Sequence, residues 1–180
     1  MNRIAAFFVL LAGFTAISGC KKVKDNYTTF EVPYSAAYPV PANDSVGHEM
    51  VFTTYDFPTS IDDALVQNKT RKDLIESGRL KSLEMNIIRY DSSINMKYGA
   101  VEELKVYLVA DGLGETFAAY KVIDPSAGTS IVFDVVDVDL KEYLKRDSFR
   151  IRIKMTLRDP ITKDTPMLFK SKFVIRAKTL

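Results

Sequence analysis

Residues 148–158 read SFRIRIKMTLR, a stretch in which apolar side chains alternate without interruption with basic or hydroxyl-bearing ones. Successive side chains of a β-strand point to opposite faces, so an alternation with period two predicts a strand with one buried and one exposed face. The apolar positions are Phe149, Ile151, Ile153, Met155 and Leu157. We therefore expect a half-buried strand of an antiparallel sheet.

A second stretch of the same kind, MLFKSKFVIRA at residues 167–177, lies close to the end of the chain. Phe169, Phe173 and Ile175 fall on one face of this strand, and basic residues fall on the other. The residues between the two stretches, DPITKDTP, are rich in proline and aspartate, which are typical of turns. The spacing predicts that the two strands pair as a terminal hairpin.

The upstream chain contains further short β-rich segments that are separated by turn residues. The predicted strands are residues 27–34, 48–57, 80–90, 101–110, 116–123 and 130–136. In the 80–90 strand, Leu83, Met85 and Ile87 share one face. Pro33 places the first strand at an edge or an end, and residues 37–47 are predicted to form a loop.

Helical patterns are short and few. Ser60 and Thr70 stand where the N-caps of two short helices are expected, and Gly78 is placed to end the second. A third short helix is predicted near Asp139, with Glu142 three residues later as its capping partner.

About eight short strands with regular turn signals predict a mostly β fold, an antiparallel immunoglobulin-like β-sandwich with a few short helices. The chain has one cysteine and no tryptophan, so the cysteine–tryptophan–cysteine core of antibody domains is excluded. A lipocalin-like or partly open β-barrel is the alternative. Residues 27–180 are expected to form a single sandwich domain.

The first nineteen residues have the three parts of a secretory signal peptide. Arg3 precedes an apolar run at residues 4–17, which is followed by the small residues Ser18 and Gly19. As a helix, fourteen residues rise about 21 Å, which is short of the roughly 30 Å thickness of a bilayer core. Residues 1–19 are therefore expected to target the chain for export.

Ile17-Ser18-Gly19-Cys20 resembles the lipobox of bacterial lipoproteins. The resemblance implies that Cys20 becomes the acylated N-terminus of the mature chain, and acyl chains such as palmitate anchor proteins to membranes. Residues 20–26 would then be a lysine-rich tether. Lys21 follows the cysteine, where enteric lipoproteins kept in the inner membrane carry aspartate. We therefore expect a cell-envelope protein on the outer membrane, facing the periplasm.

Sites for catalysis or metal binding are scarce in the sequence. Acylation of Cys20 leaves no thiol for a disulfide, and His48 is the only histidine. No Walker, GxSxG, HExxH or GxGxxG pattern occurs. The densest acidic cluster lacks the spacing of an EF-hand, and it consists of Asp134, Asp137, Asp139 and Glu142. We expect no enzyme activity, no metal and no cofactor.

Basic residues are concentrated near the C-terminus. Residues 148–180 contain nine basic and two acidic residues, whereas residues 21–147 contain fifteen basic and twenty-one acidic ones. One interpretation is a cationic face that binds an anionic envelope glycan or lipid, or another envelope protein; nucleic acid is not expected. Its candidate residues are Arg150, Arg152, Lys154, Lys170, Lys172 and Arg176. The alternative is a solvated face that is neutralised by carboxylates on neighbouring strands, such as Glu102 or Glu103.

The expected function is non-catalytic binding or assembly in the envelope. The first alternative is a carrier that holds a lipid or another apolar ligand in a β cavity, and a hydrolase is a weaker one. Tyr34 and Tyr38 lie in a proline-rich segment, where we expect them to pack against the sheet. A filled core would favour the binding module, and an apolar cavity would favour the carrier.

Overall fold

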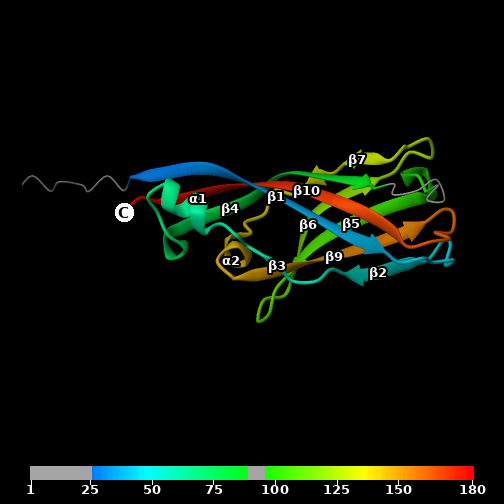
Figure 1. The fold of residues 1–180 in the computed structure, drawn as a ribbon, viewed down its shortest axis with the longest axis horizontal. Helices are drawn as coiled ribbons and strands as arrows, with labels where there is room; N and C mark the ends of the chain where they lie inside the picture. Colours follow the sequence, from blue (N-terminus) through cyan, green and yellow to red (C-terminus); the bar gives the residue numbers. More distant parts are fainter. Residues whose placement is uncertain (1–25, 89–95) are drawn as a thin grey trace, which may run out of the picture.

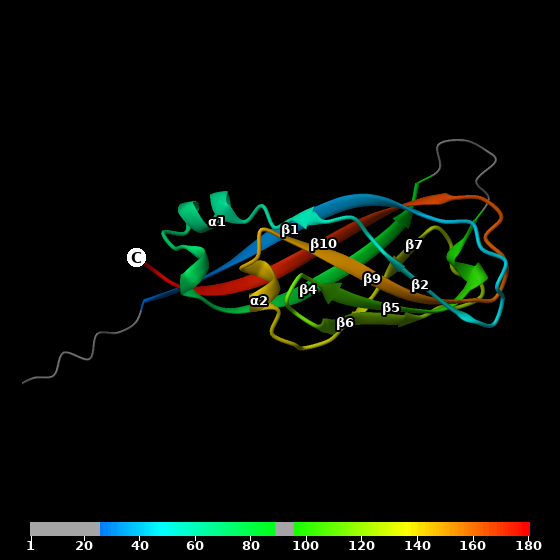
Figure 2. The same cartoon turned by 90° about the horizontal axis from the view of Figure 1, so that it is seen from below.

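The ten strands of the computed structural model form two antiparallel sheets in the part of the chain that it describes, residues 26–88 and 96–180. The first sheet has the order β1 (Tyr27–Val40), β10 (Thr165–Lys178), β4 (Ile75–Ile87) and β7 (Ser130–Val132). The second has the order β2 (Glu49–Thr53), β9 (Ser148–Leu157), β5 (Val101–Val109), β6 (Glu115–Val122) and β8 (Asp134–Val135), and β3 (Phe57–Pro58) also pairs with β9. The sheets stack as two layers that are elongated along the strands (Figures 1 and 2).

The strand order is nested. Within the sheets, β1 pairs with β10, β2 with β9, β4 with β7 and β5 with β6, as in one long hairpin. Rolling this hairpin brings β10 beside β4 and β9 beside β5, which is the order of a jelly roll. The predicted antiparallel sandwich is confirmed, and its connections are nested instead of following the seven-stranded immunoglobulin order. No strand of one described sheet pairs with a strand of the other, so the barrel alternative is not formed.

The core lies between the sheets, and its centre is the contact between β9 and β10. All five apolar positions of the 148–158 stretch are buried, and so are Phe169, Phe173 and Ile175 of β10. The rings of Phe149 and Phe173 meet across the layers with their centroids 6.2 Å apart. The alternation predicted in both strands is confirmed.

The predicted terminal hairpin is wrong, because β9 and β10 lie in different sheets and do not pair. Each strand has one apolar and one polar face. If the two strands were neighbours in one sheet, their apolar faces would lie side by side and would both need to be covered by the other layer. In opposite sheets the two apolar faces cover each other, so the residues after β9 carry the chain from one layer to the other.

Strand β1 is longer than predicted and includes four residues of the expected loop. Its edge position is confirmed, since it pairs only with β10. Pro39 lies opposite Pro166, whose carbonyl accepts the N–H of Ile88, the residue directly after β4, 2.8 Å away. Backbone groups at this pair therefore point away from each other, and the missing N–H of Pro39 faces the open edge. Pro33, six residues earlier, has the same orientation, so neither proline interrupts the pairing.

The helices α1 (Asp62–Gln67) and α2 (Lys141–Leu144) lie at the end of the sandwich that carries the C-terminus (Figure 1). Ser60 does not cap α1: the N-cap is Ile61, and Ser60 has a positive φ of 44°. The predicted second helix is only the 3₁₀ turn η1 (Lys72–Leu74), and Thr70 instead donates its hydroxyl to the Lys178 carbonyl at 2.5 Å. Its buried hydroxyl ties this connection to the end of β10.

Gly78 lies inside β4 and does not end a helix. A Cβ at this position would lie 2.3 Å from Leu144 Cδ1, so the glycine lets α2 pack directly on the strand. Asp139 accepts hydrogen bonds from the backbone N–H groups of Gly78 (2.9 Å) and Lys141 (3.1 Å). The expected capping pair with Glu142 is not formed, since the N-cap is Leu140 and has no side-chain cap.

The predicted strand at residues 130–136 is split between the two sheets. Its first part is β7 in the first sheet, and its second part is β8 in the second. The buried Phe133 lies at the crossing and donates its N–H to the Leu83 carbonyl at 3.0 Å. One more short turn, η2 (Tyr98–Ala100), precedes β5.

The predicted signal peptide, Cys20 and most of the predicted tether lie in residues 1–25, outside the described residues. In the ranges that the structure describes, no helix has the length and apolar character needed to cross a bilayer.

Gly78→Ala should lower the free energy of unfolding by about 1–3 kcal/mol, because its methyl group would overpack against Leu144. Gly128→Ala is the matched control, since a Cβ there meets nothing within 4 Å. Chemical denaturation of both variants measures the difference, and equal stabilities would contradict the proposed contact between α2 and β4.

Candidate functional site

The six basic residues expected to form one face lie on two. Arg150, Arg152 and Lys154 point outward from β9, while Lys170, Lys172 and Arg176 point outward from β10 in the other layer. Because β9 and β10 turn their apolar faces toward each other, their basic faces point in opposite directions. A single anion-binding face that combines all six residues is therefore not formed.

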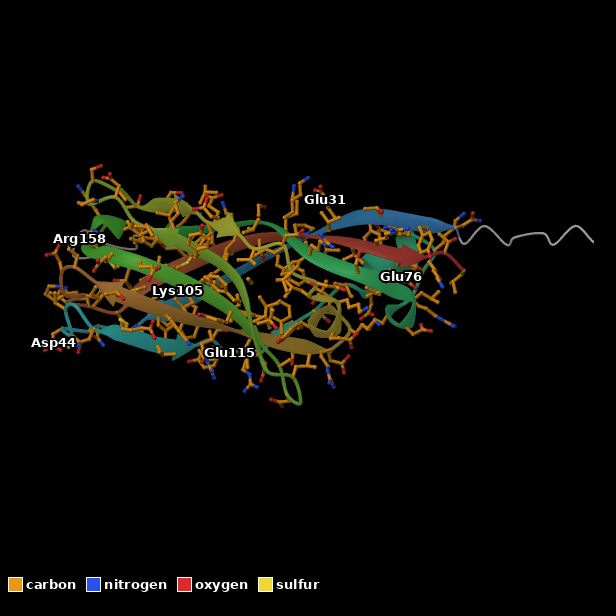
Figure 3. All side chains as sticks on the ribbon, turned by 180° about the vertical axis from the view of Figure 1, so that it is seen from behind. Glu31, Asp44, Glu76, Lys105, Glu115 and Arg158 are labelled. Carbon is orange, nitrogen blue, oxygen red and sulfur yellow. The ribbon has the colours of Figure 1, made fainter. Side chains whose placement is uncertain are left out.

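Carboxylates lie beside these basic groups on both faces. Glu115 accepts from Arg152 at 2.7 Å and from Lys154 at 3.4 Å. Glu31, on the opposite side of the sandwich, pairs with Lys172 at 3.1 Å and with Lys81 (Figure 3). Hydrogen bonds from Arg152, and then from Lys154, hold the pKa of Glu115 below its ordinary value. Both faces are thus largely neutralised from neighbouring strands.

Arg150 and Arg176 have partners of their own, and the carboxylate of Glu103 pairs within its own strand and not with β9 as expected. Arg150 pairs with Asp111 and lies 3.6 Å from Asp56, and Arg176 lies over the ring of Tyr27, 4.2 Å from its centroid. Glu103 pairs with Lys105 on its own strand at 2.6 Å instead of with β9. The basic residues therefore lie on solvated faces that carboxylates neutralise, as the alternative interpretation stated, but these carboxylates are not Glu102 or Glu103.

The acidic cluster does not converge on one point. Asp134 pairs with Lys121 at 3.3 Å, Asp137 with Arg79, and Glu142 with Lys145 at 3.7 Å. Among the described residues no three metal-ligating side chains come together. His48 is exposed immediately before β2. None of these sequence candidates forms a centre for chemistry.

A cavity of about 260 Å³ remains between the sheets, next to β1 and β3. None of the side chains that line it is charged, and both sheets contribute to its walls. The apolar wall residues include Leu80, Leu83, Val106, Leu108, Ile151 and Phe169. Ile153 and Met155 are fully buried, whereas the core keeps open space on this side.

The mouth of the cavity lies between the two edge strands. The exposed residues among its lining are Pro33 and Ser35 from β1, and Pro58 and Ser60 from β3 and the residues after it. Strand β1 pairs only with β10 and β3 only with β9, so no backbone pairing joins the two edges. This side of the sandwich is therefore closed by side chains alone.

Two tyrosines of β1 bridge this gap. Tyr34 donates its hydroxyl to the Thr59 carbonyl, and Tyr38 donates to the Thr53 carbonyl at 3.2 Å. Burial raises the pKa of Tyr34, and the charge of Asp62 raises it further, so its hydroxyl keeps its proton. Ala36 is the inward-facing residue between the tyrosines, and it also lines the cavity.

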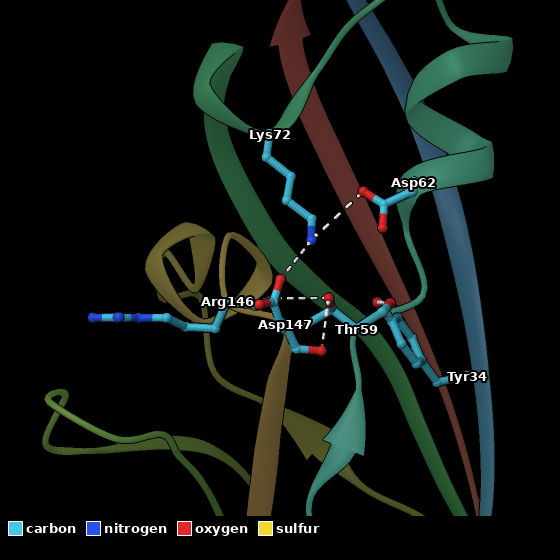
Figure 4. Close-up of polar contacts among 6 residues, drawn as sticks. All are labelled: Tyr34, Thr59, Asp62, Lys72, Arg146 and Asp147. Carbon is cyan, nitrogen blue, oxygen red and sulfur yellow. Dashed lines mark hydrogen bonds and ion pairs between the residues drawn. The ribbon is translucent and has the colours of Figure 1, made fainter.

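The β3 side of the mouth is held by Thr59, which is almost fully buried. Its hydroxyl donates to the Arg146 carbonyl at 2.7 Å, and its N–H donates to the Asp147 carbonyl at 2.8 Å (Figure 4). Lys72 lies beside it and bridges Asp62 at 3.5 Å and Asp147 at 3.2 Å. The acceptor of the Tyr34 bond is thus fixed to the start of β9.

The inner wall combines an aromatic cluster with one free hydroxyl. Tyr34 meets Phe173 at 5.3 Å and Phe149 at 5.9 Å between ring centroids, both edge to face. Ser171 lies opposite Tyr34 on β10, and its hydroxyl makes no hydrogen bond within the described part of the chain. It is a polar group available to a ligand in an otherwise apolar wall.

The sequence contained a signal for this cavity that the strand patterns alone did not reveal. Ala36 and Ser171 are small residues at inward positions, between larger apolar neighbours on the same faces. Small inward residues leave space only if they come close in the folded sandwich. Ala36 pairs with Phe169 and Ser171 pairs with Tyr34, so the two small residues are diagonal neighbours on the paired strands β1 and β10. The packing expected for Tyr34 and Tyr38 is confirmed, and their bridging role was not anticipated.

The sequence matches no protein family and no characterised protein. Structural similarity is found to a decameric BFDV capsid protein, 12% identical with a TM-score of 0.41, over 85% of this chain and 100% of the other. Desmodium yellow mottle tymovirus is 10% identical with a TM-score of 0.31, over 100% and 97% of the two chains. Likeness at these TM-scores carries no argument about function.

Glu115→Gln should reduce the loss of stability in acid. Its pKa is lowered in the folded chain, so its ion pairs stabilise the fold above the ordinary glutamate pKa and are lost as the pH falls through the lowered value. Thermal midpoints between pH 6 and pH 3 should fall less steeply in this variant than in the wild type. Glu102→Gln is the control, and equal slopes for the two variants would contradict the prediction.

Proposed function

We propose that this chain is a lipid-anchored protein of the bacterial cell envelope that binds an apolar ligand, without catalysis, in the cavity between its sheets. The sequence led us to expect a binding or assembly role, with an apolar carrier as the first alternative. The observation that supports the carrier is the cavity itself, which has uncharged walls and reaches the surface between β1 and β3.

The volume of the cavity is sufficient for a small apolar group. Cavities of about 150 Å³ lined by leucine, isoleucine and phenylalanine stay dry and bind benzene. Ligand pockets commonly have about 300–1,000 Å³. At about 260 Å³, this cavity is suited to a group larger than one benzene ring and too small for most complete lipids.

The chemistry of the wall favours an uncharged group. A charge transferred from water into apolar surroundings without a partner is strongly unfavourable. The polar side chains of the described lining carry only hydroxyls, and that of Ser171 is free while that of Tyr34 is bonded to Thr59, so the lining could orient a ligand but not neutralise one.

The proposed location is the periplasmic side of the outer membrane, and the proposed anchor is acylated Cys20. An anionic glycan or lipid, or another envelope protein, is a less supported partner. Carboxylates or an aromatic ring already lie against five of the six basic side chains, and Lys170 is the exception in the described part of the chain.

Ala36→Phe should fill the mouth of the cavity and abolish apolar binding. In the wild type, naphthalene at a hundredfold its Kd adds about 2.7 kcal/mol to the stability of the folded chain. For a chain of this length this corresponds to a rise in Tm of about 5–10 °C.

Ala37→Phe is the matched control for this experiment. Ala37 is the adjacent alanine of β1, but it faces outward and does not line the cavity. Naphthalene should raise the Tm of this variant as it does that of the wild type. If wild type and Ala36→Phe respond equally, the cavity is not the binding site.

Cys20→Ala should leave the chain without lipid, because no other thiol is present to accept the diacylglycerol. Mass spectrometry of the N-terminal peptide should show acyl chains in the wild type only, and membrane fractionation should show release of the variant. A wild-type N-terminus without acyl mass would refute the anchor.

A further inference from the structure

We infer that the cavity holds a single hydrocarbon chain of an amphiphile, inserted sideways between β1 and β3, while its polar head stays outside. This inference rests on the proposed function and names its ligand class. The three observations that carry it are the notch at Ala36, the hydroxyl-lined mouth, and the pair of tyrosine bonds across the opening.

The notch is narrow and lies in the middle of the edge strand. Strands rise about 3.4 Å per residue, so the backbone positions of Tyr34 and Tyr38 are about 14 Å apart. Between them only the methyl group of Ala36 faces inward. On the other side of the mouth lie Phe57 and Pro58, which are the only two residues of β3. A slender chain can enter here end-on once the two tyrosine bonds open, whereas a bulkier group would need a wider opening.

The mouth separates an apolar interior from a polar rim. Inside lie the apolar walls of both sheets, and the exposed hydroxyl-bearing lining residues are Ser35 and Ser60 at the two edges. Among the residues that the structure describes, no charged group lines the cavity to neutralise a carboxylate or phosphate inside it. Together with the small volume, this places the hydrocarbon chain inside and the head group in solvent.

The hydrogen bonds of Tyr34 and Tyr38 hold the mouth closed across the entry path. Each hydroxyl joins the edge of the first sheet to a carbonyl at the edge of the second. Tyr34 contacts the carbonyl of Thr59, which is buried and donates two hydrogen bonds to the start of β9. When the mouth widens, Tyr34 is therefore the side that moves. Widening the mouth for a chain therefore requires these bonds to open, which slows exchange of the bound chain.

The test uses the full acylated chain in vesicles of phosphatidylethanolamine and phosphatidylglycerol. Two photoreactive probes are added separately: a free fatty acid with a diazirine near its methyl end, and a phosphatidylglycerol with the same chain. Mass spectrometry should find adducts on cavity-lining segments, such as Phe149–Ile151 of β9 or Phe169–Phe173 of β10. Adducts from the first probe alone identify a free fatty acid as the source, and adducts from the second identify a membrane lipid.

Ala36→Phe should lower these adducts at least tenfold, and Ala37→Phe should leave them unchanged. Ser171→Leu, which fills the cavity from the neighbouring strand β10, is a second variant in case the first does not fold. Circular dichroism establishes the fold of each. Adducts only on the outer faces of the sheets, or equal labelling of all variants, would overturn the inference.

A Tyr34→Phe, Tyr38→Phe variant keeps both aromatic rings but removes the two hydrogen bonds across the mouth. The bound chain should then exchange several-fold faster when an unlabelled fatty acid is added before illumination. An unchanged exchange rate would overturn entry between the tyrosines.

The experiments distinguish a failure of the hydrocarbon-chain inference from a failure of the proposed function. If naphthalene raises the Tm but neither photoprobe labels the cavity, the cavity binds apolar groups and the inference of a hydrocarbon chain is wrong. If naphthalene has no effect and no probe labels the cavity, both proposals are refuted.

Discussion

The packing of β9 against β10 is the constraint on which the rest of the fold depends. Each strand has one fully apolar face, and burial of a large apolar side chain stabilises a protein by about 1.5–3 kcal/mol. In opposite layers the two faces cover each other, as the contact of Phe149 with Phe173 shows. The nested order then follows, since the partners of β9 and β10 come from progressively earlier parts of the chain.

The same arrangement leaves one side of the sandwich without backbone closure. Pro33 and Pro39 turn their missing donors outward, so β1 is a poor template for a further strand, and β3 is only two residues long. Tyrosine side chains join the two edges where no ladder does. A sandwich that is closed by side chains can open locally without breaking a sheet, and this is why the cavity beside Tyr34 is a better candidate site than the charged faces.

Several features were predictable because they depend on local periodicity. Alternation identified the buried faces of β4, β9 and β10, and the edge position of β1 followed from Pro33. Features that depend on a distant partner were not predictable. Gly78 resembles a helix stop until Leu144 is placed against it, and the basic residues of β9 and β10 resemble one face until the strands are assigned to different layers.

The sequence by itself determined which side of each strand is buried and that the fold is mostly β and antiparallel, because both follow from short strands with a two-residue period, whereas a sandwich and a barrel share that period. It also carries the lipobox-like stretch around Cys20, on which the expected membrane anchor rests. The tertiary structure alone decided which strands are neighbours, that the basic residues are divided between two surfaces, and that Ala36 and Ser171 border one cavity. These features require contacts between residues more than a hundred positions apart, and a periodic pattern specifies the direction of a side chain but not what lies opposite it.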